Sequence, residues 1–112
     1  MKKSLEPHVK LTFEAPGSSS GSAFGPGVAA LCEGVQETGS LNAAAKQMHM
    51  AYSKAWRIMK DTEDALGVQL LVRDGAHGST LTDDCLQLLD AYHKIQADLS
   101  KRAQAALEKS FR

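Results

Sequence analysis

Residues 40–67 read SLNAAAKQMHMAYSKAWRIMKDTEDALG, and this stretch decides the fold. Apolar residues recur three and four positions apart over 41–48 and again over 52–66, which predicts two amphipathic helices. Ser40 is a typical N-cap for the first helix, and Gly67 is placed to end the second. Because so few residues separate the two helices, the stretch predicts a helix-turn-helix.

A further helix is expected before this unit. Pro26 suits the first turn of a helix, an apolar stripe follows it, and Gly39 is placed to act as a left-handed cap. Upstream, HVKLTFE (8–14) alternates apolar and polar residues, which predicts a half-buried strand. Residues 15–27, rich in Gly, Ser and Pro, predict a mobile loop in which Phe24 anchors on the core.

A hairpin and a long helix are expected after the unit. The runs 68–72 and 79–81 predict two strands, and the Gly-containing turn 74–78 joins them into a β-hairpin. Thr82 caps a last helix expected to run from Asp83 nearly to Phe111. This order of elements predicts a mainly α fold with a small β-hairpin, namely a winged helix-turn-helix with a long C-terminal helix.

Composition excludes several classes of protein. The 112 residues carry 13 Lys and Arg against 13 Asp and Glu, so neither a uniformly basic surface nor an acidic tail is expected. The two cysteines favour neither a disulfide framework nor a metal cluster, and they suit a reducing cytoplasm. No apolar run approaches the ~20 residues of a membrane span, and no signal peptide is recognisable.

The zero net charge conceals an uneven distribution. Four cations and no acid lie between Ser40 and Lys60, whereas seven acids and one cation lie between Asp61 and Asp90. A local basic block on a neutral protein indicates a surface that faces a polyanion, with a solvated helix face as the alternative.

The outer face of the predicted helix 52–66 carries residues suited to DNA. Serine and arginine can hydrogen-bond base edges or phosphates, and aromatic rings can pack on sugars and thymine methyls. For Trp56 the alternative is peripheral packing on the preceding helix or the hairpin. The candidate DNA-binding residues comprise this outer face, a lysine of the preceding helix and two residues of the hairpin. They are Lys46, Tyr52, Ser53, Lys54, Trp56, Arg57, Lys60, Arg73 and His77.

Nothing in the sequence favours an enzyme or a cofactor. No nucleophile elbow, zinc-protease motif or P-loop occurs. The four histidines fall on different predicted elements without ligand spacing, so neither a metal nor another cofactor is expected.

The last predicted helix carries a heptad-like apolar stripe of Leu88, Tyr92, Ile95 and Leu99. Its first half is expected to pack on the core, and its second half has no evident partner within so short a chain. Dimerisation would bury the excess, so a homodimer is predicted, with a frayed amphipathic tail as the alternative.

Several motifs together carry a family resemblance. FGPG (24–27), ETGSL (37–41) and YSKAWR (52–57) are similar to the N-terminal DNA-binding domain of the molybdate-responsive (ModE-like) transcriptional regulators, within the LysR-type winged helix group. The resemblance spans roughly Phe24 to Tyr92. Ala51 stands where the family has a serine cap, and the hairpin loop is shorter than in the family. No counterpart of the family's molybdate-binding domains is expected, so molybdate sensing is not carried over.

The resemblance implies a cytoplasmic, bacterial, sequence-specific transcriptional regulator that binds inverted-repeat double-stranded DNA as a homodimer. The expected organisation is an N-terminal strand and flexible loop (1–23), a winged helix-turn-helix DNA-binding domain (24–82) and a C-terminal dimerisation helix (83–112). The alternative function is a winged-helix protein-interaction or assembly module that does not bind DNA, which the zero net charge and the acidic stretch would suit.

Overall fold

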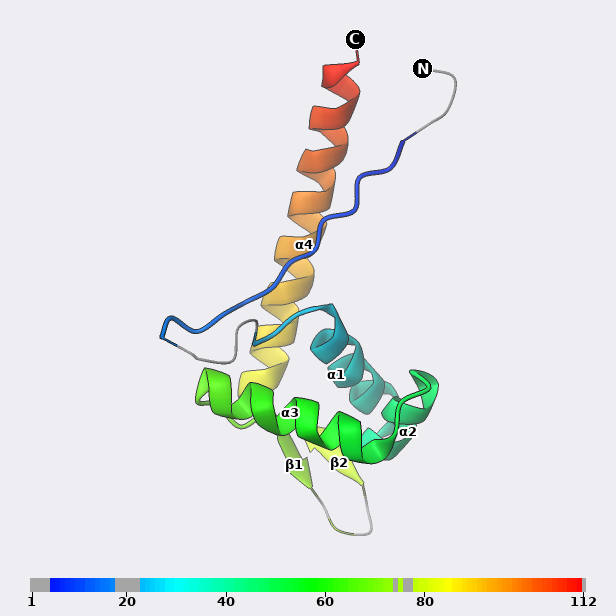
Figure 1. Ribbon diagram of the computed structural model, residues 1–112, viewed down its shortest axis with the longest axis vertical. Helices are drawn as coiled ribbons and strands as arrows, with labels where there is room; N and C mark the ends of the chain where they lie inside the picture. Colours follow the sequence, from blue (N-terminus) through cyan, green and yellow to red (C-terminus); the bar gives the residue numbers. More distant parts are fainter. Residues whose placement is uncertain (1–4, 18–22, 74, 76–77, 112) are drawn as a thin grey trace.

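The computed structural model describes residues 5–17, 23–73, 75 and 78–111, and within them the chain forms helices and one antiparallel hairpin (Figure 1). This architecture confirms the predicted mainly α fold with a small hairpin and a long C-terminal helix. The elements in chain order are α1 (Pro26–Thr38), α2 (Leu41–Gln47), α3 (Tyr52–Leu66), β1 (Leu71–Arg73), β2 (Ser79–Leu81) and α4 (Asp83–Ser110).

Local sequence signals set the helix ends. Gly39 and Gly67 both adopt the left-handed conformation, with φ of 78° and 68°, and end α1 and α3. Ser40 Oγ accepts a hydrogen bond from the Ala43 N–H, and Thr82 Oγ1 accepts one from the Cys85 N–H. Ala51 supplies no such bond, so the start of α3 depends on the packing of its inner face.

The core lies where α1, α2, α3 and the beginning of α4 meet. Gly34 of α1 lies so close to Ala44 of α2 that an added Cβ would stand 2.6 Å from the alanine methyl. This contact lets the two helices cross closely. The largest fully buried side chains include Phe24, Leu31, Leu41, Met59 and Leu70, and Phe24 thus anchors on the core as predicted.

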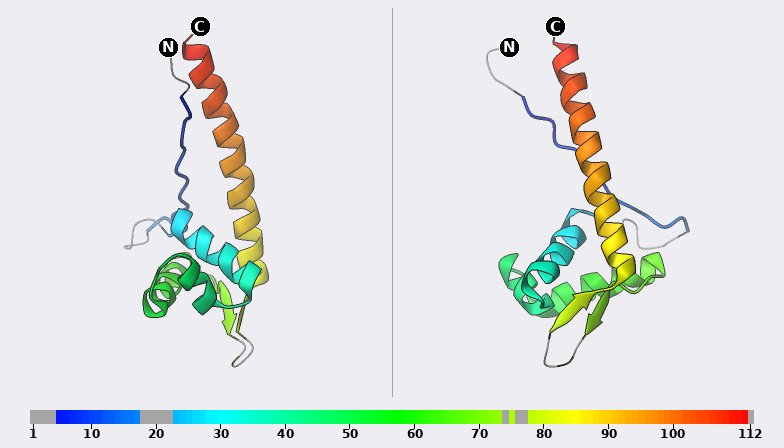
Figure 2. Two further views of the ribbon diagram at one scale, coloured as in Figure 1. Left: turned by 90° about the vertical axis from the view of Figure 1, so that its right-hand side faces the viewer. Right: turned by 180° about the vertical axis from the view of Figure 1, so that it is seen from behind.

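The predicted strand 8–14 is not formed. The N-terminal segment (residues 5–17) is extended, but its one bridge among the described residues pairs Phe13 with Phe24. Instead of joining a sheet, it runs beside α4 (Figure 2). The Leu11 carbonyl accepts from the Tyr92 hydroxyl at 3.0 Å, and the Val9 carbonyl accepts from Gln96 Nε2 at 2.7 Å. Side chains of a helix therefore replace the strand partner that the alternating pattern had suggested. The centre of the predicted mobile loop, 18–22, lies outside the described residues.

The hairpin is shorter than predicted. Its first strand begins at Leu71 instead of Val68, and its register pairs Leu71 with Leu81 and Arg73 with Ser79. The Ser79 N–H donates to the Gly39 carbonyl at 2.8 Å, which docks the hairpin on the junction between α1 and α2. Among the described helices, none combines the length and the apolar character that a membrane span requires.

Candidate nucleic-acid interface

The first half of α3 presents a polar, cationic surface. Ser53, Arg57 and Lys60 are exposed and lie three and four residues apart, so they share one face of the helix. Lys54 is exposed beside them, and Lys46 is exposed in the last turn of α2. The helix-turn-helix therefore places the predicted cations on the surface, available to a polyanion.

The charge on α3 changes sign along the helix. The exposed acids Asp61 and Asp64 follow the cations in the second half. A polyanion would be attracted to the first half and repelled by the second. The helix thus has one end suited to approach nucleic acid and one end unsuited to it.

The two aromatic residues of α3 differ in exposure: Tyr52 is exposed like Arg57, whereas Trp56 is not. The Trp56 ring is half-buried and packs at the edge of the core beside the hairpin. Arg73 Cζ lies 5.0 Å from its centroid, and Lys60 Nζ lies 5.6 Å away. Trp56 is thus partly covered at the edge of the core, and its contact with DNA stays a prediction. Tyr52, 38% exposed, lines a cleft of about 470 Å³ together with Arg73 and residues of the α2 start and the hairpin.

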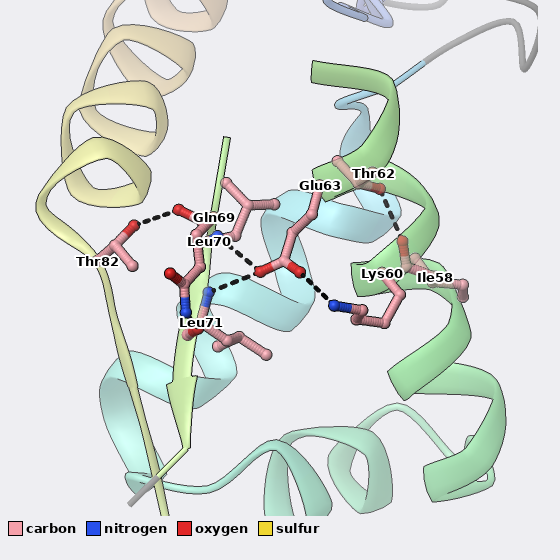
Figure 3. Close-up of polar contacts among 8 residues, drawn as sticks. All are labelled: Ile58, Lys60, Thr62, Glu63, Gln69, Leu70, Leu71 and Thr82. Atoms are coloured by element: carbon pink, nitrogen blue, oxygen red, sulfur yellow. Dashed lines mark hydrogen bonds and ion pairs between the residues drawn. The ribbon is translucent and has the colours of Figure 1, made fainter. Parts of the chain in front are cut away.

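Glu63 fastens the hairpin to α3 (Figure 3). Its Oε2 accepts hydrogen bonds from the N–H groups of Leu70 and Leu71, at 2.8 and 3.2 Å, while Oε1 lies 3.3 Å from Lys60 Nζ. The Glu63 side chain is only 11% exposed. Across the hairpin, the Thr82 hydroxyl donates to the Gln69 carbonyl at 2.6 Å. The sequence does not reveal which groups Glu63 binds, because an acid within an acidic run carries no sign of its partners.

A cleft of about 590 Å³ lies between the second half of α3 and β1. Trp56, Lys60 and Arg73 line it, but so do Glu63 and Asp64. Because cations and acids both line this cleft, it is a poor binding site for an anion. The predicted hairpin contact His77 lies outside the described residues, whereas Arg73 is exposed at the end of β1.

The two cysteines, far apart in sequence, meet in the core. Cys32 of α1 and Cys85 of α4 are free and buried, and the Cys85 thiol donates to Cys32 Sγ at 3.6 Å. The hydrogen bond with Cys85 and burial raise the pKa of the Cys32 thiol, so this thiol is poorly reactive. Among the described residues, no group of three or more His, Cys, Asp or Glu side chains could hold a metal ion.

The predicted stripe on α4 divides into two parts. Tyr92 is buried in the core, where its ring makes edge contacts with Phe13 and Phe24 at centroid distances of 5.6 and 5.4 Å. Ile95 is 41% exposed, and Leu99 is partly exposed. Tyr92 therefore serves the core, and only the neighbouring residues of the stripe leave an apolar edge open.

The tight α2–α3 unit, the cationic start of α3 and the docked hairpin define a winged helix-turn-helix domain. Comparison with known proteins identifies the family of this domain. Residues 30–86 match the bacterial regulatory helix-turn-helix proteins of the lysR family. The chain belongs to this family. No curated protein matches the sequence.

Two solved structures are similar to this chain. One is the DNA-binding domain of CbnR in complex with DNA, with 29% identity and a TM-score of 0.60, covering 76% of this chain and 95% of that one. The other is CbnR, a LysR family transcriptional regulator, with 30% identity and a TM-score of 0.57. That match covers 72% of this chain but 27% of CbnR, so the likeness concerns about a quarter of the larger protein.

Proposed function

We propose that this chain is a sequence-specific DNA-binding regulator of transcription. In this proposal the first half of α3 enters the major groove and the hairpin flanks the phosphate backbone. The observation that carries it is the exposed cationic face at the start of α3, in the second helix of a helix-turn-helix. The chain is also similar to a domain whose structure was solved in complex with DNA, which supports the proposed DNA binding.

The candidate residues divide by their expected contacts. Ser53 and Arg57, on the exposed face of α3, are assigned to base edges. Tyr52 stands at the first turn beside them. The exposed cations around these residues are assigned to phosphates, namely Lys46, Lys54, Lys60 and Arg73.

The chain is further proposed to act as a homodimer on inverted-repeat sites. Residues 24–82 would form the DNA-binding domain and residues 83–112 the dimerisation helix. Ile95 and Leu99 lie on an incompletely covered side of α4, which supports pairing there, and Leu88, partly buried against the core, continues the same stripe. Two recognition helices would then meet half-sites about 10 base pairs apart, or a multiple of that distance.

The subtype proposed is the ModE-like one. Its support is the set of motifs FGPG (24–27) and YSKAWR (52–57), which fall at the start of α1 and the start of α3. The second motif contains the proposed base-reading residues. The proposal concerns the DNA-binding part of such regulators and assigns no molybdate sensing to this chain.

A salt titration tests the proposed function. Duplexes selected from a random library by the purified chain are titrated at several salt concentrations. If the assigned cations meet phosphates, log affinity falls linearly with log salt, by about 0.9 per neutralised phosphate. Arg73→Ala should reduce this slope, whereas Lys101→Ala, which removes an exposed charge from α4, should leave it unchanged. A flat response, or no selected duplex, would favour the protein-interaction alternative.

A further inference from the structure

Trp56 lies beneath two cations that come from different elements. Arg73 is the last residue of β1, and its guanidinium carbon lies 5.0 Å from the ring centroid. Lys60, one turn further along α3, lies 5.6 Å from the same centroid. The electron-rich face of an indole attracts cations within about 6 Å. The ring therefore joins the end of the first hairpin strand to the recognition helix.

The two cations are not equivalent. Lys60 also lies 3.3 Å from Glu63 Oε1, so an ion pair already offsets part of its charge. Arg73 makes no ion pair with any described residue, and it is exposed. A guanidinium on an aromatic face uses its plane for stacking, and its N–H edge stays available to donate to a phosphate.

Contacts at both ends of β1 hold it against α3. Glu63 accepts the N–H groups of Leu70 and Leu71 where the strand begins, and Trp56 meets Arg73 where it ends. Without the Trp56 contact, only its own backbone would restrain the Arg73 side chain, at the edge of the turn. A long cationic side chain in that position loses considerable rotamer freedom when it binds.

We propose that Trp56 is a positioning residue for DNA binding, whose ring holds the Arg73 guanidinium beside α3 so that hairpin and recognition helix present their cations together. This role rests on the proposed function. It differs from the sequence-based expectation for Trp56, because the ring acts through Arg73 instead of packing on a sugar or a thymine methyl.

A double-mutant cycle tests the role. Affinity for the selected duplex is measured for the unmodified chain, Trp56→Leu, Arg73→Ala and the double variant. Trp56→Leu should weaken binding about threefold for each bound protomer, the scale of one exposed cation–π contact. Adding Trp56→Leu to Arg73→Ala should cause a clearly smaller loss, because only the more distant Lys60 then remains over the ring. Trp56→Phe, which keeps an aromatic face, should retain most of the affinity, and Lys101→Ala is the charge control.

The fluorescence of the free protein supplies a second readout, because Trp56 is the single tryptophan of the chain. Arg73→Ala should make Trp56 emission more quenchable by acrylamide, since the ring loses its cover, while Lys101→Ala should not. Two results would overturn the positioning role and leave the proposed function standing. One is unchanged acrylamide quenching in Arg73→Ala, and the other is an equal loss of DNA affinity from Trp56→Leu whether or not Arg73 is present. Failure of the unmodified chain to bind any duplex would overturn the proposed function, and this role with it.

Discussion

Arg57 and Lys46 are both exposed cations of the helix-turn-helix, yet their positions differ. Arg57 projects from the second turn of α3, on the face it shares with Ser53. Lys46 stands in the last turn of α2, the helix that crosses the DNA backbone in such motifs. An arginine in the groove can make two hydrogen bonds to one guanine, whereas a lysine at the backbone meets a phosphate present in every sequence.

Arg57→Ala should therefore relax the preference at one base position and weaken binding to the preferred site by about 1–3 kcal/mol. Lys46→Ala should weaken binding to all sequences about equally. Binding of both variants across a library of duplexes measures the two profiles. Identical profiles would refute the division of roles between α2 and α3.

Between elements, single polar groups make connections that hydrophobic packing alone does not provide. Glu63 receives two backbone N–H groups of the segment that leads into β1, and these donors would otherwise lack partners at a partly buried site. Tyr92 and Gln96 hold the N-terminal segment on α4 through its carbonyl groups. Both connections join segments whose own secondary structure is short or absent.

Glu63→Ala should lower the free energy of unfolding by about 2 kcal/mol, because two backbone donors lose their acceptor. Urea denaturation followed by circular dichroism measures the change. Asp61→Ala, on an exposed side chain of the same helix, is the matched control and should change stability by no more than about 0.5 kcal/mol. Equal effects of the two substitutions would show that Glu63 does not hold the hairpin.

Alkaline pH should loosen the N-terminal segment. Burial, reinforced by the charge of Glu33, raises the pKa of Tyr92 in the folded state. A raised pKa means that the folded state binds the Tyr92 proton more tightly than the unfolded state does. The contribution of this proton to the free energy of unfolding is complete below the pKa of tyrosine in the unfolded chain, about 10, and is lost as the pH rises past that value. The tyrosinate also has no hydrogen to donate to the Leu11 carbonyl.

Stability measured against pH should therefore fall less steeply above about pH 10 in Tyr92→Phe than in the unmodified chain. Tyr52→Phe, which alters an exposed tyrosine, should keep the steeper fall. Parallel curves for Tyr92→Phe and the unmodified chain would contradict a role for the Tyr92 proton.

At the scale of the whole molecule, α4 is the dominant feature. The chain measures 57 × 32 × 23 Å, and the long dimension follows α4 as it extends away from the helix-turn-helix (Figure 1). Its first turns bury Cys85, Leu89 and Tyr92 in the core. Further along, the rest of the chain covers α4 incompletely, which is the basis for the proposed two-fold pairing.

Leu99→Lys should shift the protein toward monomer and greatly reduce its affinity for inverted-repeat DNA, because a charge would enter the proposed seam from both protomers. Sedimentation equilibrium measures the shift, and circular dichroism should show an unchanged fold. Leu86→Lys, at an exposed leucine on the opposite side of α4, is the control and should remain dimeric. A dimeric, DNA-binding Leu99→Lys protein would place any interface elsewhere.

The sequence by itself determined the helices, the helix-turn-helix and the location of the cationic block. These features depend on signals within a few residues: apolar periodicity, the caps at Ser40 and Thr82, and the glycines that end α1 and α3. The cations of α3 could be placed on the surface for the same reason, since helical spacing fixes which side chains share a face.

Only the tertiary structure decided which distant groups meet. Trp56 rests under a cation of the hairpin, Glu63 binds backbone donors of another segment, and Tyr92 turns into its own core. The N-terminal segment has the alternation of a strand but lies on a helix, because strand formation needs a partner strand and the described chain provides only the Phe13 bridge. These contacts join residues that are far apart along the chain, so no local sequence pattern predicts them.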